Sequence, residues 1–290
     1  MFKIYFAPAW DFTSEQMVDD YRRQTPGQLP KWRDMEVTFD VKSADYLIIQ
    51  DYCDERLLNE FDPKNIYCFA RETIGLGRID DYSGTGINIF SWRDRSSYLY
   101  VKWTYPNNWA GVNKTYDELN NTQSPPDKNK ILSSIQSNKN WIEGHLKRLK
   151  FLKEFISRYP DKLDLFGGIS FSNSILPDNN KTYALDPYKY NIAFDNTLYL
   201  NYFATQFTDA ILSWSVPIFW GCPNLNEYFP EKSYIKFNVD DMGEIERIID
   251  IIKNDTYTDR INDLREARQL ILDKYNLWST IYRAITEGTT

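Results

Sequence analysis

Two places in the second half of the chain set polar side chains just after a short apolar run. Ser137 and Asn138 end the run ILSSIQSN, and Asp195 and Asn196 follow the run YKYNIAF. A helix that begins at such a place offers backbone N–H groups and the positive end of its dipole to an anion. The pattern therefore favours a diphosphate ligand, although Asn, Asp and Ser before a helix are also ordinary helix caps.

Arg148 lies further along the stretch GHLKRLKFLKEFISRY that follows Asn138. A planar guanidinium can bind a phosphate with two parallel hydrogen bonds. A charged residue on a helix is more often solvated, so the spacing alone leaves both interpretations open.

The elements that would position these side chains indicate an α/β fold. Short apolar runs that end in polar residues are typical of buried parallel strands, and further strands are expected between 87 and 103. In the first half such runs cover residues 3–6, 46–49 and 66–70. The polar stretch 116–130 contains Pro125-Pro126 and predicts a linker, so we place the domains at 1–128 and 129–290.

The sequence of the second half predicts two strand–helix–strand units. The first helix is expected to bury its apolar stripe, and Asn201 is expected to cap the second helix, in NYFATQFTDAILSW. The stripe consists of Leu146, Leu149, Leu152, Phe155 and Ile156. Alternating strands and helices predict a parallel sheet with helices on both faces. The stretch 258–285 predicts a helical tail, with Ile261, Leu264, Leu270, Ile271 and Tyr275 on one stripe.

Composition excludes several classes of function. The net charge of −7 argues against a nucleic-acid partner, which requires a basic surface. Three cysteines without a Cys-x-x-Cys pair, and His145 as the single histidine, argue against a zinc site or a multi-histidine metal site. No run approaches 18 apolar residues and the N-terminus reads as a first strand, so we expect no membrane span and a cytoplasmic protein.

The stretch from Tyr188 to Pro230 resembles the donor-binding motif of glycosyltransferase family 10, the α-1,3/1,4-fucosyltransferases. The matching residues are Phe194, Asn196, Asn201, Tyr202, Asp209, Ala210, Val216, Pro217 and Gly221. Upstream, SSIQSNKNWIEGHLKRLKFLKEF and LDLFG resemble the Ser-Asn block, the arginine and the Asp-x-x-Gly strand of that family. The resemblance covers about Lys130 to Met242, and it is faint before that.

The resemblance implies a GT-B architecture, with two Rossmann-like lobes and a last helix that returns to the first lobe. It implies an inverting, metal-independent transfer of fucose from GDP-fucose, which is a substrate and not a cofactor, to a hydroxyl of an oligosaccharide or glycoconjugate acceptor. Arg148 would neutralise the diphosphate, and Glu72 would be the base that deprotonates the acceptor. The remaining donor-binding positions would be Ser137, Asn138, Tyr190, Asp195, Asn196, Asn201, Tyr202, Thr205 and Gln206.

One departure from the family pattern puts the donor in question. The family's Thr-Glu-Lys is Ala204-Thr205-Gln206 here, and Gln206 cannot replace the lysine charge that holds the phosphate. Three explanations follow: another cation (Lys139, Lys147 or Lys189) compensates, the donor is a different nucleotide sugar, or the chain is a non-catalytic glycan-binding relative.

Overall fold

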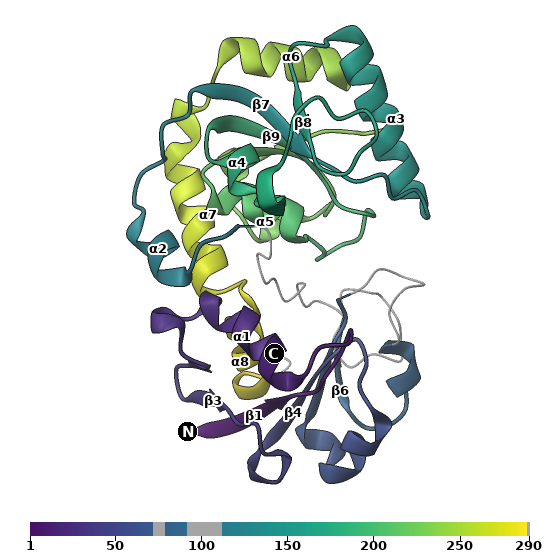
Figure 1. Cartoon of the computed structure of the whole chain (residues 1–290), viewed down its shortest axis with the longest axis vertical. Coiled ribbons are helices and arrows are strands. Elements are labelled where there is room, and N and C mark those ends of the chain that lie inside the picture. Colours follow the sequence, from purple (N-terminus) through teal and green to yellow (C-terminus); the bar gives the residue numbers. More distant parts are fainter. Residues whose placement is uncertain (72–78, 92–111, 289–290) are drawn as a thin grey trace.

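A computed structural model describes residues 1–71, 79–91 and 112–288, which form two lobes one above the other (Figure 1). Each lobe has its own sheet with helices packed against it, and helices α7 and α8 connect the two lobes along one side. Glu72 lies outside the described residues, as does most of the predicted strand region 87–103.

The first lobe contains a six-stranded sheet in the order β2-β3-β1-β4-β5-β6. All neighbours are parallel except the short edge pair of β2 and β3. The elements are β1 (Phe2–Phe6), α1 (Ser14–Tyr21), β2 (Lys31–Trp32), β3 (Met35–Val37), β4 (Tyr46–Gln50), β5 (Ile66–Phe69) and β6 (Asn88–Phe90).

The central strand β4 shows why this sheet is covered on both sides. Leu47 and Ile49 belong to one apolar cluster, Ile48 belongs to another, and all three side chains are fully buried. Alternate residues of a strand point to opposite faces, so an unbroken apolar run requires cover on both faces. The first lobe therefore has two cores, one on each side of its sheet.

The second lobe contains a five-stranded parallel sheet in the order β11-β10-β9-β7-β8. Its strands are β7 (Lys130–Ile135), β8 (Asp164–Phe166), β9 (Tyr188–Phe194), β10 (Val216–Trp220) and β11 (Ile235–Lys236). Its helices are α3 (Glu143–Arg158), α4 (Thr182–Leu185), α5 (Thr205–Leu212), α6 (Glu244–Asn254) and α7 (Ile261–Asp273). The expected parallel α/β fold of two lobes is thus confirmed.

Helix α3 forms where it was predicted, and four of the five residues of its predicted stripe pack on the core; the exception is Leu146. Leu146 is 54% exposed, whereas His145 and Arg148 are buried. The fully buried residues of the helix are Gly144, His145, Arg148, Phe151, Leu152 and Phe155. The prediction failed only at the start of the helix, where His145 and Arg148 turn inward toward the ends of the strands in place of Leu146.

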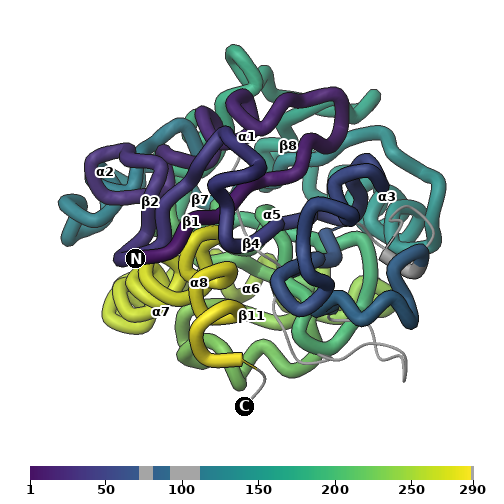
Figure 2. The backbone as a smooth tube through the Cα atoms, turned by 90° about the horizontal axis from the view of Figure 1, so that it is seen from below, coloured from purple at the N-terminus to yellow at the C-terminus, as the bar shows by residue number. Residues whose placement is uncertain are grey.

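The helical tail is two helices, and the second returns to the first lobe. Asn276 caps α8 (Leu277–Thr286) by accepting a hydrogen bond from Ser279 N at 2.7 Å. Trp278 is fully buried against Phe6 and donates from Nε1 to Tyr21 O at 2.8 Å. Figure 2 shows α8 lying beside β1 and β4 while α7 belongs to the other lobe. The predicted return of the last helix is confirmed.

The stretch expected to be a linker begins with a helix, α2 (Tyr116–Asn121). Thr115 caps it, and Glu118 completes a capping box with the backbone of Thr115. The helix contacts both lobes, because Asp117 accepts from Gly27 N at 2.8 Å and Tyr116 donates to Asp273 at 2.9 Å. This connection is therefore a packed wedge between the lobes, and the second sheet begins after it at Lys130.

A buried arginine of α7 fixes the wedge to the second lobe. Arg268 is 4% exposed and donates to the carbonyl oxygens of Leu212, Thr122 and Leu119, each at 3.0 Å. Its guanidinium lies 4.4 Å from the ring centre of Trp214. Burial lowers the pKa of Arg268 to about 10, so the side chain stays charged at neutral pH.

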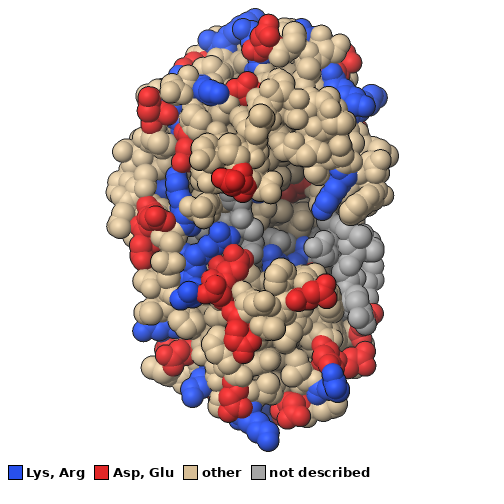
Figure 3. Space-filling view, viewed as in Figure 1, with Lys and Arg blue, Asp and Glu red and all other residues tan. Residues whose placement is uncertain are grey.

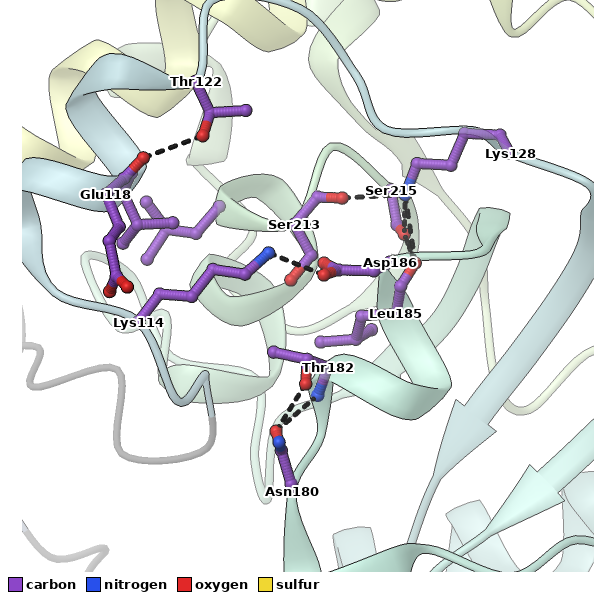
Figure 4. Close-up of polar contacts among 12 residues, drawn as sticks. Lys114, Glu118, Thr122, Lys128, Asn180, Thr182, Leu185, Asp186, Ser213 and Ser215 are labelled. Atoms are coloured by element: carbon purple, nitrogen blue, oxygen red, sulfur yellow. Dashed lines mark hydrogen bonds and ion pairs between the residues drawn. The ribbon is translucent and has the colours of Figure 1, made fainter.

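Lys128 makes a comparable contact just before β7 (Figure 4). Its stem is half-buried, but its ammonium group is enclosed and donates to Leu185 O, Ser213 O and Ser215 Oγ at 3.0, 2.7 and 3.2 Å. Burial lowers the pKa of Lys128 to about 7; Asp186 opposes this shift, and Lys114 and Arg268 add to it.

The stability of the protein should therefore depend on pH through Lys128. Between pH 7 and about 10.5 the unfolded state holds a proton that folded Lys128 releases, so the free energy of unfolding should rise with pH in this window. Urea unfolding at pH 7 and pH 9 checks this, with Lys128→Met as the reference. The advantage of the natural protein over the variant should be larger at pH 9; an equal or smaller advantage would contradict the assignment.

Candidate donor site

The carboxyl ends of β7, β9 and β10 meet at one edge of the second sheet, because these strands are parallel neighbours. In open α/β sheets this edge is where ligands bind. It faces the first lobe across the hollow that Figure 3 shows between the lobes, bordered by side chains of both charges. The loops after these strands contain most of the predicted donor-binding residues.

Arg148 reaches the end of β7 from helix α3. Its Nη2 donates to Ser137 O at 3.1 Å and to Lys139 O at 3.3 Å. The side chain is 5% exposed, its Nε has no hydrogen-bond partner, and no carboxylate of the described residues pairs with it. Burial lowers its pKa to about 10, which leaves the guanidinium charged. An isolated buried cation at the edge of a sheet is costly unless an anion joins it.

Asn138 connects the loops after β7 and β8. Its Oδ1 accepts a hydrogen bond from Ser170 N at 2.8 Å. Gly167, in the loop after β8, has φ +97°, and a Cβ there would lie 2.3 Å from Gln136 O. Asn138 is thus a loop-fixing residue, and Ser137 contributes its carbonyl to Arg148.

The start of α3 packs directly against the loop after β9. A Cβ on Gly144 would lie 2.1 Å from Asn196 O, and His145 Nε2 lies 3.0 Å from Asn196 Oδ1. Burial, and then the charge of Arg148, lower the pKa of His145, so its ring is neutral at neutral pH. The same region borders a pocket of about 430 Å³, which also includes Lys147, Thr197, Leu198, Tyr199 and Trp220. The contact with Asn196 fixes one wall of this pocket.

Gly144→Ala should disturb this wall. The added methyl has no room beside Asn196 O, so the loop after β9 must move, and overpacking of this kind costs about 1–3 kcal/mol. Thermal unfolding should show the loss, and the affinity for GDP should fall with it. Gly168→Ala is the matched control, because a Cβ there meets nothing within 4 Å and its stability should not change.

Asp195 is buried and does not point into open space. Its Oδ1 accepts from Ala204 N at 3.2 Å, and burial raises its pKa well above the usual value. A Cβ on Gly221 would lie 2.7 Å from Asp195 Oδ2, so the glycine leaves room for the carboxyl group. Asp195 therefore joins the loop after β9 to the start of α5.

Asn201 does not cap helix α5, and that prediction is wrong. The helix begins at Thr205 with Ala204 as its N-cap residue, and no side chain caps it. Asn201 has φ +65° and accepts at its Oδ1 from Asn224 Nδ2 at 2.8 Å and from Tyr228 Oη at 2.5 Å. Its left-handed conformation and these bonds shape the turn before α5, which sequence periodicity cannot distinguish from a first helical turn.

The remaining predicted residues divide into buried and accessible ones. Tyr190 and Tyr202 are buried, and the hydroxyl of Tyr190 faces Asp255 at 3.5 Å, at the amino end of β9 and away from the site. Thr205 and Gln206 are half-exposed in the first turn of α5. Of these four residues, only Thr205 and Gln206 are accessible at the start of α5, where a bound donor could contact them.

The three cations considered as substitutes for the missing lysine lie in different places. Lys189 pairs with Asp255 at the far end of β9, and Lys147 pairs with both Glu143 and Asp240. Lys139 is exposed in the loop after β7, where its Nζ lies 5.4 Å from the ring centre of Trp141 and forms no ion pair with a described residue. Of the three, Lys139 is thus the one without an ion pair among the described residues, and its backbone carbonyl accepts from Arg148.

Sequence reasoning missed two features of this site. His145 was considered only as a possible metal ligand or triad member, yet it orients Asn196. Lys181, which was not considered, pairs at 2.6 Å with the buried Asp209 of α5. Within the described residues, no group of three or more His, Cys, Asp or Glu side chains is arranged to hold a metal ion.

The two parallel α/β lobes, the hollow between them and the last helix that crosses back define a GT-B fold, the architecture of many nucleotide-sugar-dependent glycosyltransferases. In the described residues no helix is both long and apolar enough to span a membrane.

Comparisons with known proteins show what the second lobe is similar to. Residues 125–261, a little under half of the chain, match the family model described as "Glycosyltransferase family 10 (fucosyltransferase) C-term". An alpha-(1,3)-fucosyltransferase of Helicobacter pylori is 36% identical over 88 residues, which are 30% of this chain and 18% of that protein. The chain thus matches less than a fifth of the length of that relative.

Solved structures confirm the fold over nearly the whole chain. An α1,3-fucosyltransferase with GDP has a TM-score of 0.58 at 17% identity, covering 100% of this chain and 91% of the other. A crystal structure of an α1,3-fucosyltransferase with GDP-fucose has a TM-score of 0.55 at 16% identity, covering 92% of this chain and 82% of the other. A trehalose-6-phosphate structure from E. coli, bound with UDP-2-fluoro glucose, has a TM-score of 0.53 at 12% identity, covering 84% and 73%.

Proposed function

We propose that this protein is an inverting, metal-independent glycosyltransferase that transfers fucose from GDP-fucose to a hydroxyl of an acceptor glycan. The observation that carries the proposal is the buried guanidinium of Arg148, which has no counter-ion among the described residues. It lies at the sheet edge where open α/β folds bind ligands, in the lobe that matches the family 10 model. A diphosphate would supply the missing negative charge.

The chemistry requires charge stabilisation on the donor side. As the bond between the sugar and the diphosphate breaks, negative charge builds on the phosphate oxygens, and fixed cations and N–H donors lower the energy of that state. Arg148 and Lys139 would supply the cations, and the uncapped start of α5 at Thr205 would supply N–H groups.

The acceptor side requires a base. The acceptor hydroxyl attacks the anomeric carbon from the face opposite the diphosphate and must lose its proton to a carboxylate of the first lobe. We propose Glu72 for this role, on its position after β5.

The proposal is tested by measuring thermal stabilisation with GDP, GDP-fucose, a UDP-sugar and a CMP-sugar, because a ligand that binds only the folded state raises the melting temperature. We expect guanine nucleotides to stabilise the protein and GDP-fucose to be consumed when an acceptor is present. If no guanine nucleotide binds, this function is excluded.

The half-exposed Gln206 favours a second candidate, a transferase of the same fold with a different donor. Stabilisation by the UDP- or CMP-sugar alone would support it. Binding of glycans without binding or turnover of any nucleotide sugar would instead support a non-catalytic relative.

Restoring the family's charge distinguishes these candidates. If the donor is a GDP-sugar bound as in the family, Gln206→Lys should tighten GDP binding about tenfold or more, because a charge-assisted hydrogen bond contributes about 1.5–3 kcal/mol. Gln206→Met controls for the change in packing and should not tighten binding. Unchanged affinity in the lysine variant, measured by calorimetry, would show that the phosphate lies elsewhere.

A further inference from the structure

His145, the single histidine of the chain, is buried at the carboxyl edge of the second sheet. Its side chain is 2% exposed and lies between the first turn of α3 and the loop after β9. The ring of Trp141 packs against it edge-on, with the ring centres 6.2 Å apart. A histidine enclosed in this way changes its charge only when the charges around it change.

The two ring nitrogens of His145 have different surroundings. Nε2 lies 3.0 Å from Asn196 Oδ1, and because an amide oxygen only accepts, Nε2 carries the hydrogen and donates it. In the neutral ring Nδ1 is therefore an unprotonated acceptor. It is buried and has no hydrogen-bond partner among the described residues. Nδ1 is thus the atom at which the ring can gain a proton.

The charges that act on this ring are positive. Burial is the main cause that lowers the pKa of His145, and the charges of Arg148 and Lys139 lower it further, whereas the hydrogen bond with Asn196 opposes this. Arg148 lies three residues along α3, on the same face of the helix, and Lys139 belongs to the loop after β7. The protein without its ligand therefore keeps the imidazole neutral.

The carboxyl groups nearest in sequence have other partners. Glu143 pairs with Lys147 at 2.9 Å, and Asp195, in the loop after β9, is buried and accepts a hydrogen bond from the backbone at the start of α5. No carboxylate of the described residues forms an ion pair with His145. An anion that would stabilise an imidazolium must therefore come from a ligand.

A bound nucleoside diphosphate would reverse the sign of the charge beside this ring. Its phosphates would bring negative charge to Arg148, one helical turn from His145, and a nearby negative charge favours the protonated form of histidine. The added proton leaves the hydrogen bond with Asn196 intact, because both nitrogens of an imidazolium donate. Protonation therefore adds a charge without moving this wall of the site.

We propose that His145 takes up a proton from solvent when the diphosphate of the nucleotide sugar binds, and so supplies the positive charge that Gln206 lacks. This inference rests on the proposed function, because it requires a diphosphate beside Arg148. Binding should then strengthen as the pH falls. From high to low pH the affinity rises about tenfold for each unit by which the pKa of His145 is higher in the complex than in the free protein.

A single histidine makes the test direct, because its ring protons give NMR signals that no other residue can produce. The ring Hε1 signal of His145 is followed from about pH 5 to about pH 9 on the full chain, free and saturated with GDP-fucose. The diphosphate of GDP-fucose is esterified at both ends, so it does not itself titrate in this range. We expect saturation to raise the midpoint of the titration by about one unit or more. An unchanged or lower midpoint would overturn the proposal.

Calorimetric titration with GDP-fucose at about pH 6 and about pH 8 tests the consequence for affinity. The natural protein should bind about tenfold more tightly at the lower pH. His145→Gln keeps an N–H donor for Asn196 but cannot become charged, so its affinity should be the same at both pH values. Lys153→Gln is the matched control, because it removes an exposed charge from the same helix and should keep the pH dependence.

Each comparison is made within one variant, so a loss of stability in His145→Gln does not affect the result. An equal pH dependence in His145→Gln and in the natural protein would overturn the role of His145. The absence of GDP-fucose binding at both pH values would contradict the proposed function itself, whereas binding that does not depend on pH would contradict only this inference.

Discussion

Arg148→Ala is expected to weaken GDP binding by about 10- to 100-fold, which corresponds to the 1.5–3 kcal/mol of a lost charge-assisted hydrogen bond. The guanidinium is buried, has no carboxylate partner among the described residues and holds the loop after β7 through Ser137 and Lys139. The substitution removes both a cation and the support of that loop. Calorimetric titration with GDP measures the effect directly.

Arg158→Ala is the control for this experiment. Arg158 lies on the same helix, but it is at the last turn, is part-exposed and pairs with Glu154 and Glu246. Its removal should leave GDP affinity unchanged. Arg148→Lys should keep part of the affinity, since the charge remains without the planar fork. If both Arg148→Ala and Arg158→Ala bind GDP as tightly as the natural protein, Arg148 does not hold the diphosphate.

Arg268→Ala should cause the largest loss of stability, about 3–5 kcal/mol in the free energy of unfolding, because each buried acceptor left without a donor costs about 1–3 kcal/mol. The substitution leaves three carbonyl oxygens without their donor and removes the cation from the face of Trp214. Two of these oxygens belong to the end of the wedge helix α2, so the connection between the lobes loosens as well. Urea unfolding followed by tryptophan fluorescence measures the change.

Arg265→Ala provides the comparison, because Arg265 lies on the same helix and also approaches Trp214, at 5.8 Å. Its contacts are exposed, so its loss should cost less than about 1 kcal/mol. Similar destabilisation by the two variants would mean that the hydrogen bonds of Arg268 are not what fixes the wedge.

The fold was largely predictable because its strands are short, apolar and bounded by polar residues. Leu47, Ile48 and Ile49 are an unbroken apolar run, and such a run fits a sheet that is covered on both faces. The return of the last helix was predictable only through resemblance, because nothing in its composition tells which lobe Trp278 enters.

The site was less predictable, since polar groups were assigned by their position after a strand. Asp195 and Asn201 follow that rule, yet their side chains bind the protein's own backbone and Asn224. A ligand contact and a loop-fixing contact use the same residue types, and only the surrounding atoms distinguish them. The inward turn of Arg148 was likewise hidden, because the sequence pattern of α3 favoured Leu146 as the buried residue.

The placement of α8 has a consequence for biosynthesis. The core of the first lobe includes Leu277, Trp278 and Ile281, so its hydrophobic contacts remain incomplete until almost all of the described chain has left the ribosome. The second lobe, whose core ends at Tyr275, has all of its residues available earlier. The first lobe, whose strands are translated first, can therefore complete its core only after the second lobe has been translated.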